Sequence, residues 1–230
     1  MSSRSRPRET VSVRLLLASS DLTFRPGGDA LAAELAELVG AGSGAGARTA
    51  IVLNALDDAS DLPRETRLEH ERRSLATLAR DASELDLRNH YDQPDGLRAA
   101  LAGVGLVWVV GGNAFTLRAA MARSGLDGLL TKRVREDSIV YGGYSAGACA
   151  AGPTLLGADL IDGAGAGDGP IWGGLGLVDF SIVPHYRSGR TDDEPFERIA
   201  AHLQLRGLPH RVLRDGQAIV IAGESISLRE

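Results

Sequence analysis

Cysteine is almost missing from this sequence: Cys149 is the only one among 230 residues. A single cysteine cannot form an intramolecular disulfide, and it cannot supply a cysteine-rich zinc site. This cysteine usage is typical of proteins in a reducing compartment, so we expect a cytoplasmic protein.

Long apolar runs and an excess of positive charge are also missing. No apolar run approaches the roughly 20 residues that a membrane helix needs. Lys and Arg number 25 against 30 Asp and Glu, which gives a net charge of −5, and no basic patch follows the first eight residues. We therefore expect neither a nucleic-acid partner nor a membrane partner. The apolar residues 11–19 could mimic a secretory signal, but the stretch is short and Arg14 interrupts it, which favours a first core strand.

What the sequence does contain is an alternation of apolar runs with amphipathic stretches. Residues 106–110 (LVWVV) are continuously apolar, as expected of a parallel strand that is covered on both faces. The leucines at positions 31, 35 and 38 follow a helical period. Strands are predicted at residues 11–18, 49–54, 85–87, 106–110, 138–141 and 177–184, and helices at residues 29–39, 63–82, 97–103, 114–123, 126–136 and 194–204.

This alternation predicts an α/β fold with a mostly parallel sheet flanked by helices. Residues 211–213 and 217–221 flank Asp215-Gly216, which is a hairpin turn signal, so the C-terminal edge is expected to be antiparallel. We expect a disordered tail over residues 1–10 and a single domain over residues 11–230.

The most informative segment is GYSAG at residues 143–147, which fits the G-x-S-x-G pattern of a nucleophile elbow. Such a turn from strand to helix strains the serine backbone and presents its hydroxyl above the sheet. Ser145 is therefore the candidate nucleophile. The N–H of Ala146, at the start of the following helix, would point toward an oxyanion formed at that serine.

A serine needs a base, and the sequence offers five histidines. His185 differs from the others because it follows the apolar strand predicted at residues 177–184. Catalytic groups of open α/β sheets gather at the carboxyl ends of strands, which favours His185 as the base. A loop histidine with structural hydrogen bonds is the alternative reading.

The sequence indicates the orienting acid and the second oxyanion donor less specifically than it indicates Ser145 and His185. Asp159 and Asp162 lie between the serine and the histidine, and Asp159 follows the short apolar stretch 155–158. A solvated loop aspartate fits the same pattern equally well. The turn at residues 111–113 (GGN) directly follows the 106–110 strand, so the N–H of Gly112 is the natural second donor.

Two known folds could hold a serine elbow, a histidine base and a glycine turn of this kind. In an α/β-hydrolase several βα units usually separate the serine from the histidine, whereas here the interval is 40 residues. A class I glutamine amidotransferase-like sheet places the elbow late and the base soon afterwards, which suits this chain better.

Residues 109–115 (VVGGNAF), 144–148 (YSAGA) and 182–186 (IVPHY) resemble the peptidase E (aspartyl dipeptidase) and cyanophycinase family. The resemblance extends over residues 11–221. It implies a serine peptidase on a glutamine amidotransferase-like fold with flavodoxin-like layering, without a metal or an organic cofactor. The roles that it implies are those of the nucleophile Ser145, the base His185, the oxyanion donors Gly112 and Ala146, and the acid Asp159, with Asp162 as the alternative acid.

The sequence departs from this family where peptidase E carries an arginine that is thought to recognise an N-terminal aspartate. Pro195 lies near that position here. Arg187 and Arg190 are candidate substitutes, since a guanidinium can bind a carboxylate in bidentate fashion, although exposed loop arginines are the plainer reading. Strict aspartyl specificity is therefore not expected.

The expected substrate is a short peptide, with Asn113 and Tyr144 as further candidate substrate-binding residues. A serine esterase or amidase acting on another acyl compound requires the same triad and stays open. A non-catalytic binding protein on the same fold also stays open, as does a homodimer.

Overall fold

The computed structural model describes residues 13–230 except 25, 42–47, 60, 77, 79, 80, 164–168, 190 and 192. The tail expected over residues 1–10 lies outside the described residues. Within the described part of the chain, no helix is both long and apolar enough to cross a membrane.

The main sheet has seven strands in the order β3-β2-β4-β5-β1-β8-β9. Neighbouring strands from β3 to β1 are parallel, while β8 is antiparallel to β1 and β9 is antiparallel to β8. This arrangement confirms the predicted α/β class and its antiparallel C-terminal edge. The strands are β1 (Arg14–Ala18), β2 (Arg48–Val52), β3 (Ala82–Glu84), β4 (Val104–Val109), β5 (Val140–Tyr144), β8 (Ala218–Ala222) and β9 (Ser225–Arg229).

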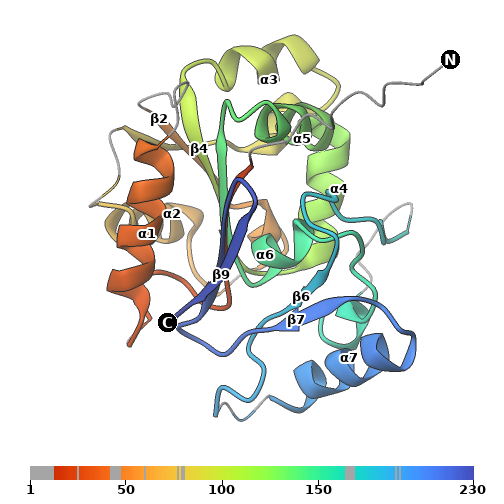
Figure 1. Ribbon diagram of the computed structural model, residues 1–230. Helices are drawn as coiled ribbons and strands as arrows, with labels where there is room; N and C mark the ends of the chain where they lie inside the picture. The colour runs from red at the N-terminus through yellow and green to blue at the C-terminus, as the bar shows by residue number, and fades with distance from the viewer. Residues whose placement is uncertain are drawn as a thin grey trace, which may run out of the picture.

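Helices cover both faces of this sheet. Figure 1 shows α1 and α2 on one side and α4 and α6 on the other. Both faces of the central strands are thereby removed from water, which explains why every residue of β4 is buried. The helices are α1 (Gly28–Gly40), α2 (Arg64–Ser74), α3 (Pro94–Ala100), α4 (Ala114–Ser124), α5 (Leu126–Arg135), α6 (Ala146–Ala150) and α7 (Glu194–Leu205), with short 3-10 turns η1 (Asn54–Leu56), η2 (Leu87–His90) and η3 (Ala158–Leu160).

Arg14, which interrupts the first apolar run, lies inside β1 and is only 4% exposed. Its guanidinium donates to a carboxylate oxygen of Asp137 at 2.6 Å and to the Leu38 carbonyl oxygen at 2.6 Å. A buried charge is tolerated only when it is paired and hydrogen-bonded. The expectation of a core strand at this end of the chain is therefore confirmed.

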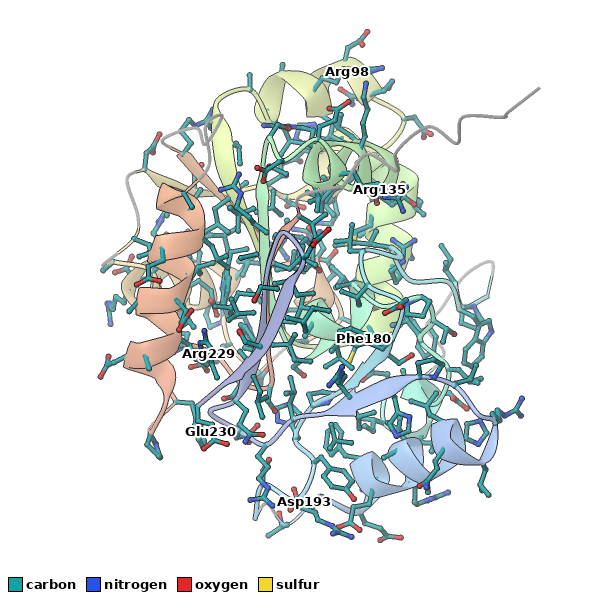
Figure 2. The ribbon with its side chains drawn as sticks, in the orientation of Figure 1. Arg98, Arg135, Phe180, Asp193, Arg229 and Glu230 are labelled. Atoms are coloured by element: carbon teal, nitrogen blue, oxygen red, sulfur yellow. The ribbon has the colours of Figure 1, made fainter. Side chains whose placement is uncertain are left out.

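A smaller unit lies beyond one end of the main sheet. It consists of a second sheet, in which β6 (Ser181–Val183) and β7 (His210–Val212) are parallel, and of helix α7. Figure 1 shows these two strands between α6 and α7. The small unit has its own apolar cluster, made of Val183, Phe196, Ile199, Ala200 and Leu203. Phe180, which Figure 2 labels where the chain enters β6, still belongs to the main core.

Four predicted elements differ from the structure. No strand forms at residues 85–87, because β3 ends at Glu84 and η2 begins at Leu87. The strand predicted at residues 177–184 contracts to Ser181–Val183 and lies in the second sheet. The helix predicted over residues 63–82 ends at Ser74, and β3 begins at Ala82. The Asp215-Gly216 signal does not form a hairpin, because β7 pairs with β6 while β8 pairs with β1 and β9. The chain instead passes from one sheet to the other at this turn.

Candidate active site

Ser145 lies at the turn from β5 into α6 with φ 51° and ψ −117°. A positive φ at a non-glycine residue is strained, and such strain is typical of nucleophile elbows. The surrounding glycines are required by close packing. A Cβ on Gly143 would lie 2.9 Å from the Val109 carbonyl oxygen, and a Cβ on Gly147 would collide with the same atom. The elbow predicted from the GYSAG pattern is thus present.

His185 reaches this serine from the small unit, two residues after β6 ends. Its Nε2 lies 3.1 Å from Ser145 Oγ, which is hydrogen-bonding distance. The backbone at His185 also has a positive φ, 55°. The structure therefore brings the two residues together as the sequence predicted.

The acid beside His185 is Asp215, whose Oδ1 lies 2.6 Å from His185 Nδ1. Both side chains are largely buried, at 12% exposure for His185 and 5% for Asp215. A carboxylate at Nδ1 keeps the proton on that nitrogen, which leaves Nε2 free to accept the serine proton. The geometry thus presents a serine, an imidazole and a carboxylate in series.

Neither of the aspartates expected as the acid contacts His185 in this way. Asp159 is exposed in η3. Asp162 accepts a hydrogen bond from the N–H of Ala114 at 2.7 Å, at the start of α4. Burial raises the pKa of Asp162, and that hydrogen bond opposes the rise. The structure therefore places Asp215 beside His185, where Asp159 or Asp162 was expected.

Ser19, one residue past the end of β1, links the base to the acid. Its hydroxyl donates to Asp215 Oδ1 at 2.9 Å and accepts the backbone N–H of His185 at 2.7 Å. The residue is fully buried. A polar residue directly after a buried strand was the only sequence signal for this position, and it was not specific enough to single Ser19 out.

The expected oxyanion donors lie beside the serine. Gly112 and Ala146 line the same cavity as Ser145. Ala146 opens α6, so its N–H belongs to the first turn and has no partner within the helix. Gly112 has φ 138°, a conformation that favours glycine, and a Cβ there would collide with the Ala55 carbonyl oxygen. Both expected donor residues therefore contribute to the cavity wall beside Ser145.

A buried carboxyl group anchors the elbow from below. The Tyr144 hydroxyl donates to Glu71 Oε1 at 2.9 Å, and Trp108 Nε1 donates to Glu71 Oε2 at 2.8 Å. Burial raises the pKa of Glu71, and these two hydrogen bonds oppose the rise. The Gly111 backbone also bonds to Tyr144, whose pKa is held well above its usual value by burial and by Glu71. The network therefore joins the elbow to the Gly111 turn.

A cavity of about 260 Å³ opens beside Ser145. The loop after α6, strand β6 and helix α7 supply most of its walls. No lysine or arginine is among the described residues that line it, and Asp162 is its one acidic residue. The apolar walls are formed mainly by Leu155, Leu156, Ile182, Val183, Phe196 and Ile199.

Two of the other candidate substrate-binding residues, Asn113 and Arg187, lie outside the cavity. The Asn113 side chain caps α4, because its Oδ1 accepts the N–H groups of Phe115 and Thr116 at 2.9 and 3.0 Å. Arg187 is exposed and pairs with Glu197 at 3.2 Å. Arg190 lies outside the described residues. Neither Asn113 nor Arg187 is among the residues that line the described cavity.

The cavity thiol and possible metal ligands are the remaining features of this region. Cys149 lines the cavity, but burial raises the pKa of its thiol to about 12, so the thiol stays protonated at neutral pH. Among the described residues, no group of three or more His, Cys, Asp or Glu side chains is placed to hold a metal ion.

Known proteins share this sequence pattern. A model of peptidase family S51 matches residues 15–229. Peptidase E of Streptomyces coelicolor is 34% identical over 188 residues, which cover 78% of this chain and 70% of that protein. An uncharacterized peptidase of Listeria innocua is 26% identical over 163 residues, which cover 69% of this chain and 74% of that protein.

Solved structures share the fold. A candidate peptidase E of Listeria monocytogenes superimposes with a TM-score of 0.76 at 22% identity, covering 95% of this chain and 98% of that chain. A peptidase from an acI-B1 Actinobacterium superimposes with a TM-score of 0.66 at 15% identity, covering 95% of this chain and 88% of that chain. At 22% and 15% identity, these superpositions show that the fold is shared.

Proposed function

The chain belongs to peptidase family S51 and is a serine-type peptidase, and we propose that it hydrolyses short peptides through an acyl-enzyme on Ser145. One observation supports the proposal above all others. Ser145 Oγ, the two nitrogens of His185 and Asp215 Oδ1 form a continuous series, with separations of 3.1 and 2.6 Å. This is the arrangement that activates a serine hydroxyl.

In the acylation step, Ser145 Oγ attacks the peptide carbonyl carbon while His185 Nε2 takes the hydroxyl proton. Asp215 holds the imidazole in the required tautomer and stabilises the imidazolium that forms. The N–H groups of Gly112 and Ala146 stabilise the oxyanion of the tetrahedral intermediate. The C–N bond then breaks, and His185 gives its proton to the leaving amine.

In the deacylation step, a water molecule attacks the ester carbon of the acyl-enzyme. His185 takes a proton from that water, and the same two backbone N–H groups stabilise the second oxyanion. The bond between the acyl carbon and Ser145 Oγ breaks, and His185 returns the proton to the serine. The products are a carboxylic acid and an amine, and the enzyme is regenerated.

Short peptides, dipeptides included, are the proposed substrates because the cavity at Ser145 is small. Its volume of about 260 Å³ lies below the range of about 300–1,000 Å³ that is typical of pockets for drug-sized ligands. A cavity of this size suits one substrate residue better than a long peptide segment.

The proposal is tested with the Ser145→Ala variant on a dipeptide library. We expect kcat/KM to fall by at least about 10⁴-fold, since removing the nucleophile of a serine peptidase abolishes acylation. The midpoint of thermal unfolding serves as the control for folding. Hydrolysis by Ser145→Ala at the full wild-type rate would contradict the mechanism.

Short acyl esters, assayed beside the dipeptides, separate peptide hydrolysis from esterase activity. Cleavage of dipeptides supports the proposal. Cleavage of esters alone would assign the same triad to an esterase. Absence of turnover on either class would assign the fold to a binding protein.

A further inference from the structure

The residues that line the cavity beside Ser145 favour some substrate side chains over others. It is continuous with the nucleophile, the base and both oxyanion donors, because all of them line it. A substrate residue bound in this cavity would therefore lie both against these walls and beside the reacting carbonyl group.

The far walls are apolar and largely buried. Leu155 is 2% exposed, Ile182 is 4% exposed and Leu203 is 1% exposed. Residues of α7 contribute Phe196 and Ile199, whose exposed fractions are 8% and 7%. An apolar side chain that enters the cavity would replace water against this surface, which is favourable in proportion to the area that it buries.

The charge in the cavity disfavours an acidic side chain. Asp162 is the one acidic residue among the described lining, and none of the described lining residues is a lysine or an arginine. A substrate carboxylate would lose its hydration without gaining a cation from the described lining, and an unpaired buried charge is costly. The exposed Arg187 does not offset this cost, because it pairs with Glu197 outside the cavity.

We propose that this cavity binds the residue on the acyl side of the scissile bond and selects an uncharged, apolar side chain, such as leucine or methionine, over aspartate. The inference rests on the proposed peptidase function and deepens it. The resemblance to peptidase E alone would imply specificity for aspartate. The residues that line this cavity instead favour an apolar side chain.

Four dipeptides test the wild-type preference: Leu-Ala, Asp-Ala, Ala-Leu and Ala-Asp. We expect kcat/KM for Leu-Ala to exceed that for Asp-Ala by about 10- to 100-fold, as apolar pockets discriminate by such factors. The pair Ala-Leu and Ala-Asp should differ much less. Equal or faster cleavage of Asp-Ala would overturn the proposal, as would a preference confined to the leaving residue.

Ile161→Arg sharpens the test by placing a cation at the cavity. Ile161 lines the cavity and is 43% exposed, so an arginine can be accommodated without opening the core. We expect the ratio of Leu-Ala to Asp-Ala cleavage to fall by about tenfold or more. The matched control is Leu160→Arg, because Leu160 is 37% exposed and does not line the cavity. An unchanged ratio in Ile161→Arg, or the same change in both variants, would contradict the proposal.

Fluorophosphonate labelling of Ser145 distinguishes a failure of the proposed apolar preference from a failure of the proposed peptidase function. Labelling together with dipeptide cleavage that lacks an apolar preference would refute the cavity inference alone. Absence of both labelling and dipeptide cleavage would refute the proposed function and this inference with it.

Discussion

The main sheet and the small unit of β6, β7 and α7 contribute different parts of the candidate site. The main sheet supplies Ser145 and the Gly111–Gly112 turn, which follow the adjacent parallel strands β5 and β4. The small unit supplies His185 after β6, and α7 supplies much of the apolar cavity wall. Nucleophile and base therefore meet at the boundary between two separately packed clusters.

The two regions also differ in how each functional residue is held. Ser145 is fixed by its own turn, where backbone atoms and glycines pack without room for side chains. His185 is fixed by groups from elsewhere, namely Asp215 after β7 and Ser19 after β1. The position of His185 therefore depends on contacts that cross the boundary. Mutations of these contacts should lower activity while leaving the main sheet folded.

Among variants at this boundary, the largest effect is expected from Asp215→Asn, which removes the carboxylate beside His185. An amide at that position favours the wrong imidazole tautomer, and a comparable change lowers kcat by about 10⁴-fold in the serine peptidase template. We expect a fall in kcat of about 10³- to 10⁴-fold, measured by dipeptide hydrolysis. Asp159→Asn is the matched control and should keep wild-type activity. A large loss in Asp159→Asn with a small one in Asp215→Asn would reverse our assignment of the acid.

A smaller effect is expected from Ser19→Ala, which removes one side-chain hydroxyl from the same boundary. The hydrogen bonds to Asp215 and to the His185 N–H are lost together. A typical hydrogen bond contributes about 0.5–1.5 kcal/mol, so we expect kcat to fall by about tenfold. Ser20→Ala is the comparison, because the Ser20 hydroxyl accepts the Gly216 N–H rather than touching the acid or the base. Equal kcat values for the two variants would argue against a positioning role for Ser19.

Glu71→Gln probes the main-sheet side, where the carboxyl group supports Tyr144. We expect a loss of activity of only a few-fold, since one hydrogen bond beneath the elbow is weakened. Burial raises the pKa of Glu71 in the folded state above its usual value of 4.5. The folded state therefore retains this proton better than the unfolded state does, and this contribution to stability is lost as the pH rises above about 4.5.

The same variant thus makes a pH-dependent prediction. The midpoint of thermal unfolding of Glu71→Gln, relative to that of the wild type, should increase between pH 4.5 and pH 7. Thermal unfolding of both proteins across this interval measures it. A difference that stays constant with pH, or that changes in the opposite direction, would show that burial does not raise the pKa of this carboxyl group.

The smallest effect is expected from Cys149→Ser. The thiol lines the cavity, but burial raises its pKa to about 12, so it is not the nucleophile. We expect dipeptide hydrolysis within about twofold of the wild type, as for substitutions that remove no essential contact. Loss of hydrolysis, with Ser145 still labelled by a fluorophosphonate, would give the thiol a role that the present account lacks.

Most of the main-sheet half of the site could be predicted from sequence because it is encoded locally. The apolar run 106–110 and the GYSAG segment each carry their own strand signal and turn chemistry. Parallel strands place their following loops at one sheet edge, so Gly112 and Ser145 were expected together. The structure places both residues on one cavity.

The carboxylate beside His185 could not be predicted because its position depends on a pairing between distant strands. Asp215-Gly216 has the chemistry of a hairpin turn, and that interpretation separated Asp215 from His185. In the structure β7 instead pairs in parallel with β6, and Val183 lies opposite Val212. The residues that follow the two strands are then neighbours, which brings Asp215 to His185. Asp159 had a suitable local context, but it is exposed in η3.

The most direct test of the central claim is the rate at which a fluorophosphonate labels Ser145, with the adduct located by peptide mass spectrometry. We predict one adduct, on Ser145, formed at equal rates in the wild type and in Asp159→Asn, and at least about 10²-fold more slowly in Asp215→Asn because general-base activation is lost. Wild-type protein without an adduct on Ser145, or equal rates in wild type and Asp215→Asn, would contradict the account.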